Sequence, residues 1–378
     1  MKKTIILAIE TSCDETGLAL VEASGGLKSP RFKILKNLIA SQIKVHQPFG
    51  GVVPNLAKRE HLKNLPILYK KLVAKPYTLD PDLIAVTVGP GLEPALWTGI
   101  NFAEKLGKEI KNQKSPPKAD PPQAEKIKII GTNHLEGHLY SFLLPSQSKT
   151  YNLKPKTLFP AAALIVSGGH TILLLVKDLK SWKHLGETRD DAVGEAFDKV
   201  ARLLKLPYPG GPALEKLARK GDSRAIEFPR PMMHDKNFDF SFSGLKTSVL
   251  YYLRDLGYSQ WPLATRVNSR KLLNPIPQTL MANIAASFQA AAIEVLVKKT
   301  MRAAREFGAR SVMLSGGVAA NKSLRAELKK ETRKTGLNFL VAEQKYNTDN
   351  AVMIAVAGYM TYLRKKKYPM KANGNLSI

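Results

Sequence analysis

The chain has 378 residues, and its 58 lysines and arginines against 31 aspartates and glutamates give a formal net charge of +27. This length exceeds what one small hydrophobic core organises, so two domains are expected. The longest apolar runs, such as AAALIV and TILLLV, are strand-sized and fall short of the about 20 residues that span a bilayer. The positive charge favours a nucleic acid over a membrane surface, because no long basic amphipathic helix is present, although a lysine-rich composition alone would give the same charge.

The N-terminal region indicates the cellular compartment. The chain contains one cysteine, Cys13, which excludes an intrachain disulfide and a cysteine-based zinc site. The first apolar run ends at the acidic Glu10 without a small-residue cleavage site, which is typical of a buried strand and not of a signal peptide. We therefore expect a reducing, cytoplasmic location and no membrane association.

Two pairs of segments repeat the same order of elements. KTIILAIETSCDETGLALVEA predicts strand, polar turn and strand, and AAALIVSGGHTILLLVKD repeats this plan. DLIAVTVGPGLEPALWTGINFAEKL and ARSVMLSGGVAANKSLRAELKK each predict a strand, a Gly-rich loop and a helix. This self-similarity indicates a duplicated α/β domain with two lobes facing each other across a cleft. Such loops suit phosphate binding through backbone N–H groups, although no standard phosphate-binding motif is present.

The segments between these elements suggest the domain boundaries. We predict an N-terminal lobe over residues 1–132, a C-terminal lobe over 133–365 that carries the metal site, and a frayed basic tail over 366–378. The Pro- and Lys-rich segment 111–126 is predicted to be an exposed linker inserted in the first lobe. A second insertion, 254–278, mixes basic and aromatic residues, which suits either RNA contact or an ordered surface loop.

The stretch NHLEGHL contains a histidine pair at helical spacing. His134 and His138 are four residues apart, so both imidazoles lie on one face of a predicted helix. The spacing is typical of a metal site and equally of two structural histidines. A zinc-protease motif requires glutamate directly after the first histidine, whereas here Leu135 holds that position and Glu136 lies about 200° around the helix. A metalloprotease is therefore disfavoured.

A third metal ligand is available in the segment YNTDNAVMIAVAGYMTYL. Asn347 and Thr348 are predicted to begin a nearly all-apolar, buried helix, which places Asp349 in its first turn at the edge of the core. An unpaired carboxylate there is costly, and a divalent metal would neutralise it. Two histidines and one aspartate leave coordination positions open, which suits zinc or ferrous iron. The alternative is that Asp349 caps its own helix.

Two further segments place polar groups beside predicted turns. In DAVGEAFDKVARLLKLPYPGGPALE, the carboxylates of Asp198 and Glu215 lie beside a turn that exposes the backbone of Gly210 and Gly211, an arrangement that suits recognition of hydroxyl groups such as those of ribose. Acidic residues on a solvated helix are the commoner explanation for each one alone. In FSFSGLKT, Lys246 either contacts a phosphate or belongs to the ordinary charged surface.

Ten short motifs together resemble one family, the bacterial TsaD-type tRNA threonylcarbamoyladenosine transferases. They are ETSCDET, GVVPNLA, GPGL, NHLEGHL, VSGGHT, DAVGEAFDK, PGGPALE, FSFSGLKT, SGGVAANK and TDNAVMIA, in the family's order. The resemblance implies a duplicated, two-lobed α/β fold of the actin, sugar-kinase and Hsp70 type. It also implies transfer of threonylcarbamoyl from threonylcarbamoyl-AMP to N6 of the adenosine 3′ of the anticodon, in tRNAs reading codons that begin with A.

The resemblance also implies functional residues. His134, His138 and Asp349 match the ligands of one divalent metal, usually iron, with zinc as the alternative. The substrate-binding positions match Ile165, Val166, Ser167, Gly168, Gly169, Asp198, Gly211, Glu215 and Asn321. A metal there would polarise the carbamoyl carbonyl, while the acidic and glycine positions would hold the ribose and the Asn321 loop would lie against the adenine. The chain departs from the family pattern at Asn55, Glu93, Pro94, Asn133 and Asn347.

Family behaviour implies tRNA as substrate, an inactive TsaB-like paralogue as dimer partner and a small TsaE-like ATPase. Two other functions stay open on the residues alone. The first is an ATPase or phosphotransferase of the same fold, which would hold its metal mainly through phosphates and leave the histidine pair unexplained. The second is a non-catalytic, nucleotide-sensing scaffold that binds tRNA and partners without turnover.

Overall fold

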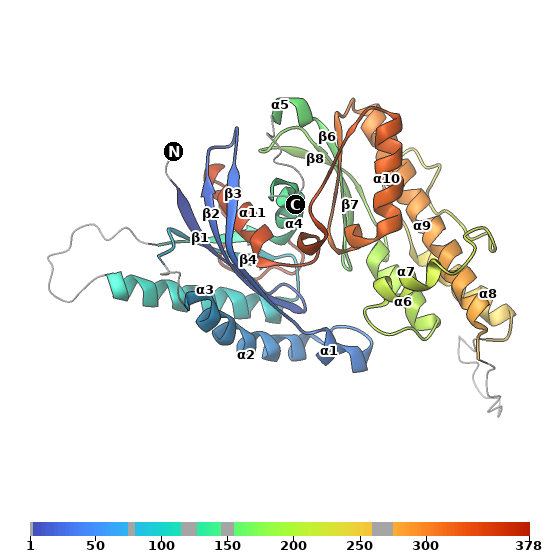
Figure 1. Ribbon diagram of the computed structural model, residues 1–378, viewed down its shortest axis with the longest axis horizontal. Helices are drawn as coiled ribbons and strands as arrows, with labels where there is room; N and C mark the ends of the chain where they lie inside the picture. Colours follow the sequence, from blue (N-terminus) through green and yellow to red (C-terminus); the bar gives the residue numbers. More distant parts are fainter. Residues whose placement is uncertain (1–2, 75–79, 115–126, 145–154, 259–274) are drawn as a thin grey trace. The chain divides into compact units, whose positions relative to one another are not determined.

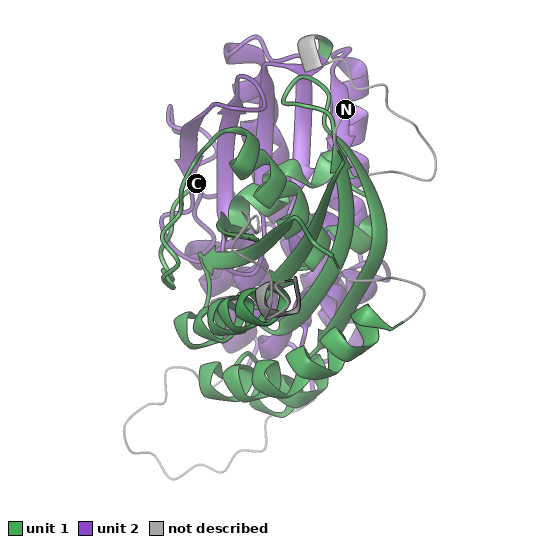
Figure 2. Cartoon of the chain, turned by 90° about the vertical axis from the view of Figure 1, so that its left-hand side faces the viewer, with its two compact units in different colours: residues 1–157, 341–378 green, residues 158–340 purple. Residues whose placement is uncertain are grey.

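The structure is a computed structural model that describes residues 3–74, 80–114, 127–144, 155–258 and 275–378 (Figure 1). The chain divides into two compact units, drawn in different colours in Figure 2. Unit 1 comprises residues 1–157 and 341–378, and unit 2 comprises residues 158–340. Each unit contains a five-stranded mixed sheet with helices, which confirms the predicted duplicated α/β fold class.

Unit 1 is built on a sheet with the strand order β3-β2-β1-β4-β5. Strand β1 pairs antiparallel with β2 and parallel with β4, and β4 pairs parallel with β5. The strands are β1 (Thr4–Glu10), β2 (Glu15–Ser24), β3 (Arg31–Ser41), β4 (Leu83–Gly89) and β5 (Lys128–Asn133). The helices and turns are α1 (Ile43–His46), η1 (Gln47–Phe49), α2 (Pro54–Val73), α3 (Glu93–Lys114), α4 (His134–Tyr140), η2 (Ser141–Leu143), α5 (Pro155–Leu158), η4 (Gln344–Tyr346) and α11 (Ala351–Leu363).

The alternation of side chains along these strands separates the two faces of the sheet. Ile84 and Val86 of β4 belong to the core cluster that includes the apolar faces of α2 and α3. Between them, Ala85 lies on the opposite face, where a Cβ built on Gly358 of α11 would come within 2.5 Å of the Ala85 Cβ. Helices α2 and α3 therefore cover one face of the sheet and α11 covers the other (Figure 1).

Unit 2 repeats this plan with the order β10-β9-β6-β7-β8. Strand β6 pairs antiparallel with β7 and parallel with β9, as β1 does with β2 and β4. The strands are β6 (Ala161–Val166), β7 (Thr171–Val176), β8 (Trp182–Glu187), β9 (Ser311–Ser315) and β10 (Asn338–Val341). The helices and turns are α6 (Val193–Leu203), α7 (Gly210–Ala218), α8 (Ser243–Asp255), α9 (Gln278–Glu306), η3 (Gly317–Ala320) and α10 (Lys322–Lys334).

The boundaries of unit 1 differ from those of the predicted lobes 1–132 and 133–365. It includes α4 and α11, which the sequence prediction assigned to the C-terminal lobe. The physical reason is the apolar surface of α11, where every residue from Ala351 to Thr361 is buried and the helix packs against β1, β2 and β5. The predicted insertions 111–126 and 254–278 lie outside the described residues except where their ends form α3, α8 and α9.

The prediction of a frayed tail over residues 366–378 was wrong. Ala372 is 5% exposed and belongs to the hydrophobic core of unit 1, with Met370 and Leu376 packed beside it. The backbone N–H of Asn373 donates a 2.9 Å hydrogen bond to the carbonyl of Val88 at the end of β4. The segment is polar in composition, but these apolar contacts and backbone hydrogen bonds fix it to the sheet.

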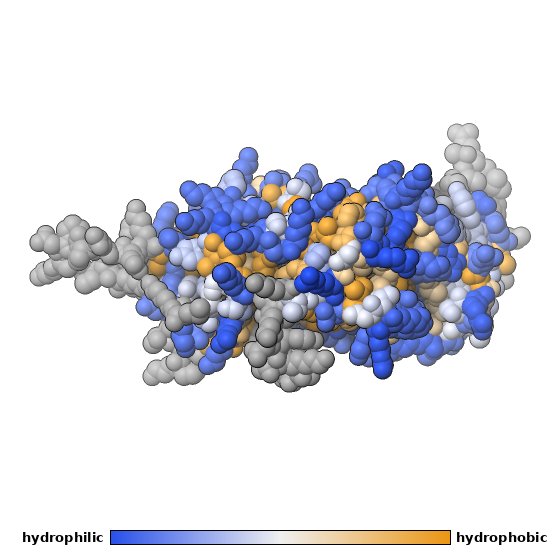
Figure 3. Space-filling model, turned by 90° about the horizontal axis from the view of Figure 1, so that it is seen from above, coloured by the Kyte–Doolittle hydropathy of each residue, from blue (hydrophilic) through white to orange (hydrophobic). Residues whose placement is uncertain are grey.

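One helix is longer and more apolar than the strand-sized apolar runs expected from the sequence. Helix α9 is long and apolar enough to cross a membrane, contrary to the sequence prediction, but 72% of its most apolar stretch is buried inside the protein. This burial is typical of the central helix of a packed domain. On the face drawn in Figure 3, hydrophilic side chains cover most of the described surface, with smaller apolar patches between them.

Candidate functional site

Three predicted ligands come together in unit 1. Ligand atoms of His134, His138 and Asp349 all lie within 4.8 Å of one another. The Asp349 Oδ1 atom is 3.4 Å from His134 Nε2 and 3.2 Å from His138 Nε2. Ligands about 2.1 Å from a tetrahedral metal are separated by about 3.4 Å, so the two distances from Asp349 already suit one ion. The two histidine nitrogens, which lie within 4.8 Å of each other, would move closer on binding it.

The N-terminal cap of helix α4 sets the position of the histidine pair. The side chain of Asn133 caps the helix by accepting hydrogen bonds from the N–H groups of Leu135 and Glu136 at 2.8 and 3.2 Å. His134 is therefore the first helical residue, and the two imidazole rings meet edge to face at 4.7 Å. Gly137 allows α11 to approach closely, since a Cβ there would lie 3.1 Å from Met353 Cγ and Ile354 Cδ1.

The position of Asp349 differs from the predicted one. Helix α11 begins at Ala351, and Asn350 caps it by accepting a 3.0 Å hydrogen bond from the Met353 N–H. Asp349 therefore precedes the helix and does not lie in its first turn. The alternative that Asp349 caps its own helix is wrong, because Asn350 fulfils that role and leaves the carboxylate directed at the histidines.

The electrostatics of the three side chains suit a cation. Burial disfavours protonation of His134, but Asp349 and Glu10 outweigh it and raise the pKa of His134 well above its usual range. Burial alone would raise the pKa of Asp349, yet the two histidines bring it far below its usual value. Burial lowers the pKa of His138, whose buried Nδ1 atom has no hydrogen-bond partner among the described residues. A buried neutral imidazole beside a carboxylate is a natural metal ligand set.

Sequence reasoning missed two residues that orient His134. The Nδ1 atom of His134 lies 3.2 Å from Glu10 Oε2 and 3.1 Å from Ser12 Oγ, which leaves Nε2 directed towards Asp349. Glu10 is fully buried, and it also accepts hydrogen bonds from Thr87 Oγ1 and the Ser12 N–H. A carboxylate behind a histidine ligand is a recurrent feature of metal sites. An acidic residue ending a buried strand, followed by two hydroxyl residues, was the available signal.

The other predicted residues lie in unit 2, around the end of β6. Ile165 and Val166 are buried at the end of this strand, and Ser167, Gly168 and Gly169 form the turn into β7. The two glycines have open space where a side chain would begin. Helix α6 approaches this turn closely, since a Cβ on Gly194 would lie 2.5 Å from the Ser167 carbonyl oxygen. The Ser167 N–H donates to the His170 carbonyl at 2.8 Å, so the exposed part of the turn is the backbone of Gly168 and Gly169.

Two carboxylates of unit 2 fix neighbouring backbone segments. Asp198 Oδ1 accepts a 3.0 Å hydrogen bond from the Gly211 N–H at the start of α7. Glu215 Oε1 accepts a 3.1 Å hydrogen bond from the Lys322 N–H. Asn321 precedes that residue and caps α10 through the Leu324 N–H at 2.9 Å. These contacts bring Asp198 next to Gly211, and Glu215 next to Asn321, with acceptor capacity suited to hydroxyl groups.

The remaining predicted groups have ordinary structural roles. Lys246 Nζ forms an ion pair with Asp191 at 3.2 Å, so its charge is compensated within unit 2. Burial raises the pKa of the Cys13 thiol well above its usual value, which makes it a poor nucleophile.

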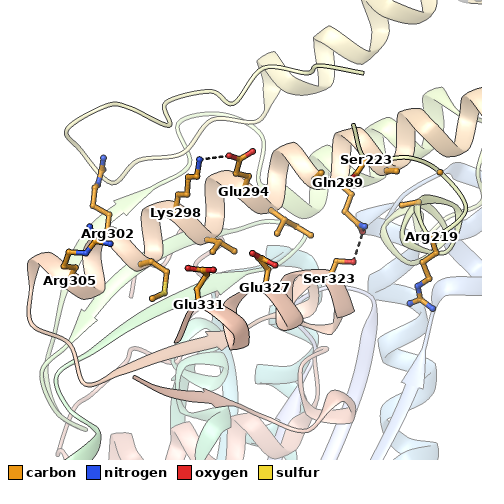
Figure 4. Close-up of a pocket in the computed structure, with 17 residues that line it drawn as sticks. Arg219, Ser223, Gln289, Glu294, Lys298, Arg302, Arg305, Ser323, Glu327 and Glu331 are labelled. Carbon is orange, nitrogen blue, oxygen red and sulfur yellow. Dashed lines mark hydrogen bonds and ion pairs between the residues drawn. The ribbon is translucent and has the colours of Figure 1, made fainter. Parts of the chain in front are cut away.

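A groove of about 860 Å³ runs between α9 and α10 (Figure 4), but none of the predicted site residues lines it.

The chain matches one protein family along most of its length. The profile of the family described as TsaD, tRNA N6-adenosine threonylcarbamoyltransferase, matches residues 33–115 and 123–356. The protein of that name from Moorella thermoacetica is 43% identical over 373 residues, covering 98% of this chain and 96% of the relative. Its namesake from Thermosipho melanesiensis is 43% identical over 377 residues, covering 99% of this chain and 100% of the relative.

Solved structures match the fold. The structure of full-length HypF in its phosphate- and nucleotide-bound form aligns with a TM-score of 0.52 and 14% identity over 98% of this chain. HypF from T. kodakarensis aligns with a TM-score of 0.54 and 16% identity over 97% of this chain. The chain spans about half the length of these two proteins, 48% and 49%.

Proposed function

Because this chain belongs to the family of tRNA N6-adenosine threonylcarbamoyltransferases, we propose that it takes the threonylcarbamoyl group from threonylcarbamoyl-AMP and transfers it to N6 of the adenosine 3′ of the anticodon. The proposed substrates are tRNAs that read codons beginning with A. The observation that carries the proposal is the convergence of His134, His138 and Asp349 in unit 1. An ATPase or phosphotransferase of the same fold would leave this histidine pair unexplained.

We propose that these three residues hold one divalent metal, with Fe²⁺ preferred and Zn²⁺ as the alternative. When bound, the metal supplies Lewis acidity towards a carbonyl oxygen of the substrate. Glu10 and Ser12 contact Nδ1 of His134 and would keep its Nε2 atom available to the metal, as second partners of ligating histidines generally do. The Asp349 side chain is 21% exposed while His138 is fully buried, so the accessible side of the site is the side of Asp349.

The residues of unit 2 are proposed to bind the adenylate part of the donor. Gly168 and Gly169 offer backbone that a ligand can approach. Asp198, Gly211 and Glu215 would hold the ribose, and the Asn321 segment would lie against the adenine. In the reaction, the N6 amine attacks the carbamoyl carbon, the bond to the phosphate oxygen breaks, AMP leaves and the amine loses a proton. Positioning of two bound substrates contributes a large part of such rate enhancements.

The partners and location follow from the same proposal. A net charge of +27 suits a chain that grips the tRNA backbone. We propose a TsaB-like inactive paralogue and a small TsaE-like ATPase as protein partners, and a cytoplasmic location where tRNA is modified. The scaffold alternative predicts the same tRNA binding without turnover, so activity separates the two.

The test is a transfer assay with labelled threonylcarbamoyl-AMP and an unmodified tRNA that reads a codon beginning with A, with and without the partner subunits. Label should enter the tRNA with wild type and with the control His184→Ala, which changes an exposed histidine of unit 2. It should disappear with His134→Ala and Asp349→Ala, while tRNA binding is retained. Tight tRNA binding without label under every partner combination would refute the transferase and support the scaffold.

A further inference from the structure

Helix α4 has only seven residues, from His134 to Tyr140, and a helix this short is not stable by itself in water. The position of its two histidines therefore depends on what holds the helix from outside. The segment Arg364–Ser377, called here the strap, follows α11 and contacts α4 and the preceding residues at two separate points.

The first point is Glu136, which lies between the two histidines in the sequence but on the opposite face of the helix, and is fully buried. Its carboxylate accepts hydrogen bonds from Tyr368 Oη at 2.6 Å and Lys366 Nζ at 3.0 Å, and it also pairs with Arg364. A fourth, longer contact of 3.4 Å comes from Thr361 Oγ1 of α11. A buried carboxylate with several charge-assisted partners is strongly held, and three of these four partners belong to the strap.

The second point is the residue that caps the helix. Asn133 uses its side-chain oxygen for the cap and its Nδ2 atom to donate a 2.8 Å hydrogen bond to the carbonyl of Ser377. Glu136 and Asn133 thus connect both the first turn of α4 and its cap to the strap. Between these contacts, Tyr368 also packs on β5, where a Cβ on Gly131 would lie 3.1 Å from the Tyr368 carbonyl oxygen.

A third contact reaches the other side of His134 through the loop after β4. The Gly91 N–H donates a 3.3 Å hydrogen bond to the carbonyl of Gly374, and the Gly374 N–H donates to Glu93 Oε1 at 3.2 Å. The same loop donates from the Leu92 N–H to the Ser12 carbonyl at 2.8 Å. Ser12 contacts Nδ1 of His134 through its hydroxyl at 3.1 Å, so the strap is connected to this histidine indirectly, through the loop and Ser12.

We propose that the strap positions the metal-bearing helix and that Glu136 is the positioning residue through which it acts. Glu136 does not contact the metal position; it sets the location of α4, and through it the geometry of His134 and His138. This inference rests on the metal site of the proposed function and adds a determinant of that site which the family resemblance did not supply.

The test compares two double variants with matched chemistry. Lys366→Gln/Tyr368→Phe removes two of the strap's bonds to Glu136 and leaves Arg364 in place, so the carboxylate stays paired. The control Lys367→Gln/Tyr362→Phe makes the same chemical changes at an exposed lysine and an exposed tyrosine that do not contact Glu136. Binding of Co²⁺ is titrated by its absorption bands, and hydrogen exchange is measured for the backbone amides of α4.

We expect the dissociation constant for Co²⁺ to rise about tenfold in the strap variant, in the range known for outer partners of metal ligands. Exchange of the α4 amides should accelerate, and both values should stay at the wild-type level in the control. The transfer rate should recover at saturating metal, because all three ligands remain. A role limited to overall stability would lower the unfolding temperature without changing Co²⁺ affinity.

Three outcomes would overturn the proposal or separate it from the proposed function. Equal Co²⁺ affinity and equal α4 exchange in the folded strap variant and wild type would refute the strap alone. A wild type that binds no divalent metal would refute the strap proposal and the metal site together. The strap variant could bind Co²⁺ more weakly while even wild type shows no transfer activity. This result would support the strap proposal and contradict the transferase mechanism. Glu136→Gln, which keeps the side-chain shape, should repeat the affinity loss.

Discussion

The two units share a strand order but differ in the charge that they bury. Of the buried Asp, Glu, His and Lys side chains among the described residues, unit 2 contains one, Lys299. Unit 1 contains seven: Glu10, Asp14, His46, His61, His134, Glu136 and His138. At the end of β1, unit 1 places Glu10 and Ser12, whereas the equivalent strand β6 of unit 2 ends in the turn Ser167–Gly169.

This difference shows how one scaffold can be used for two kinds of ligand. Buried charges are costly unless they are paired, and the proposed cation would pair with the buried charges that surround Asp349. Exposed backbone N–H groups and fixed carboxylates, as in unit 2, suit phosphates and hydroxyls. The apolar sheets of the two units remain equivalent, and the chemical difference lies in the connections at the ends of their strands.

The largest test of this comparison removes the charge of Asp349. At a metal concentration 100 times the dissociation constant, binding to the folded state should stabilise wild type by about 2.7 kcal/mol. Asp349→Asn should lose this stabilisation, and its transfer rate should fall on the order of 10³-fold because polarisation of the carbonyl is lost. Denaturant unfolding with and without metal measures the first effect. The control Asp235→Asn in unit 2 should behave as wild type, and equal metal stabilisation of both variants would exclude Asp349 as a ligand.

A smaller effect is expected from the carboxylate behind His134. Glu10→Gln keeps the shape of the side chain but removes the negative charge beside Nδ1, so metal affinity should fall about tenfold to a hundredfold. Competition with a chelator measures this affinity directly. If affinity were unchanged while transfer fell, Glu10 would act on the substrate, and the charge buried in unit 1 would not serve the metal alone.

A glycine of unit 2 should affect donor binding without loss of stability, in contrast to the charged residues of unit 1. A Cβ on Gly168 would meet no atom within 4 Å, and its backbone φ lies outside the left-handed region, so Gly168→Ala should keep or slightly raise stability, by about 0.4–1 kcal/mol. The methyl group should obstruct the approach of threonylcarbamoyl-AMP to the backbone of the turn. The KM for this donor should therefore rise about tenfold, which corresponds to the loss of roughly one hydrogen bond. Gly26→Ala, in similarly open space of unit 1, is the control. An unchanged KM would remove this turn from the donor site.

The smallest effect concerns Lys299, the buried charge of unit 2. Its Nζ donates to the Met232 carbonyl at 2.6 Å, and burial lowers its pKa to about 8. The unfolded chain binds this proton more tightly, so wild type should gain stability relative to Lys299→Met as the pH rises from about 8 to about 10.5, on the order of 1 kcal/mol. Urea unfolding of both proteins across this range tests the sign. A difference that stays constant with pH would mean that Lys299 titrates normally.

The sequence was sufficient for the duplicated fold and for the three ligand candidates, because periodic apolar runs and the i, i+4 histidine spacing are local signals. It was insufficient for the start of α11, since Asn347, Asp349 and Asn350 are all good capping residues and only the folded chain decides among them. It also missed Glu10, because an acid after an apolar run is read as the end of a strand, and its partner His134 is 124 residues away.

The tail illustrates the same limit. Its three lysines, one proline and one glycine are typical of a flexible end, and no periodicity indicates that Tyr368 reaches a buried carboxylate 232 residues earlier. Two residues that depart from the family pattern form hydrogen bonds with this segment. Glu93 accepts one from the Gly374 N–H, and Asn133 donates one to the Ser377 carbonyl. Contacts of such separation depend on the three-dimensional arrangement, which composition does not encode.

The discontinuous make-up of unit 1 has a consequence for the order of events during protein synthesis. His134 and His138 leave the ribosome before unit 2 is made, whereas Asp349 and α11 follow after it. At about 5–20 residues per second, roughly 10–40 s separate the histidines from the aspartate. A nascent chain would therefore carry an incomplete set of the proposed ligands throughout the synthesis of unit 2. The proposed metal site could form only in a polypeptide that has been translated past residue 349.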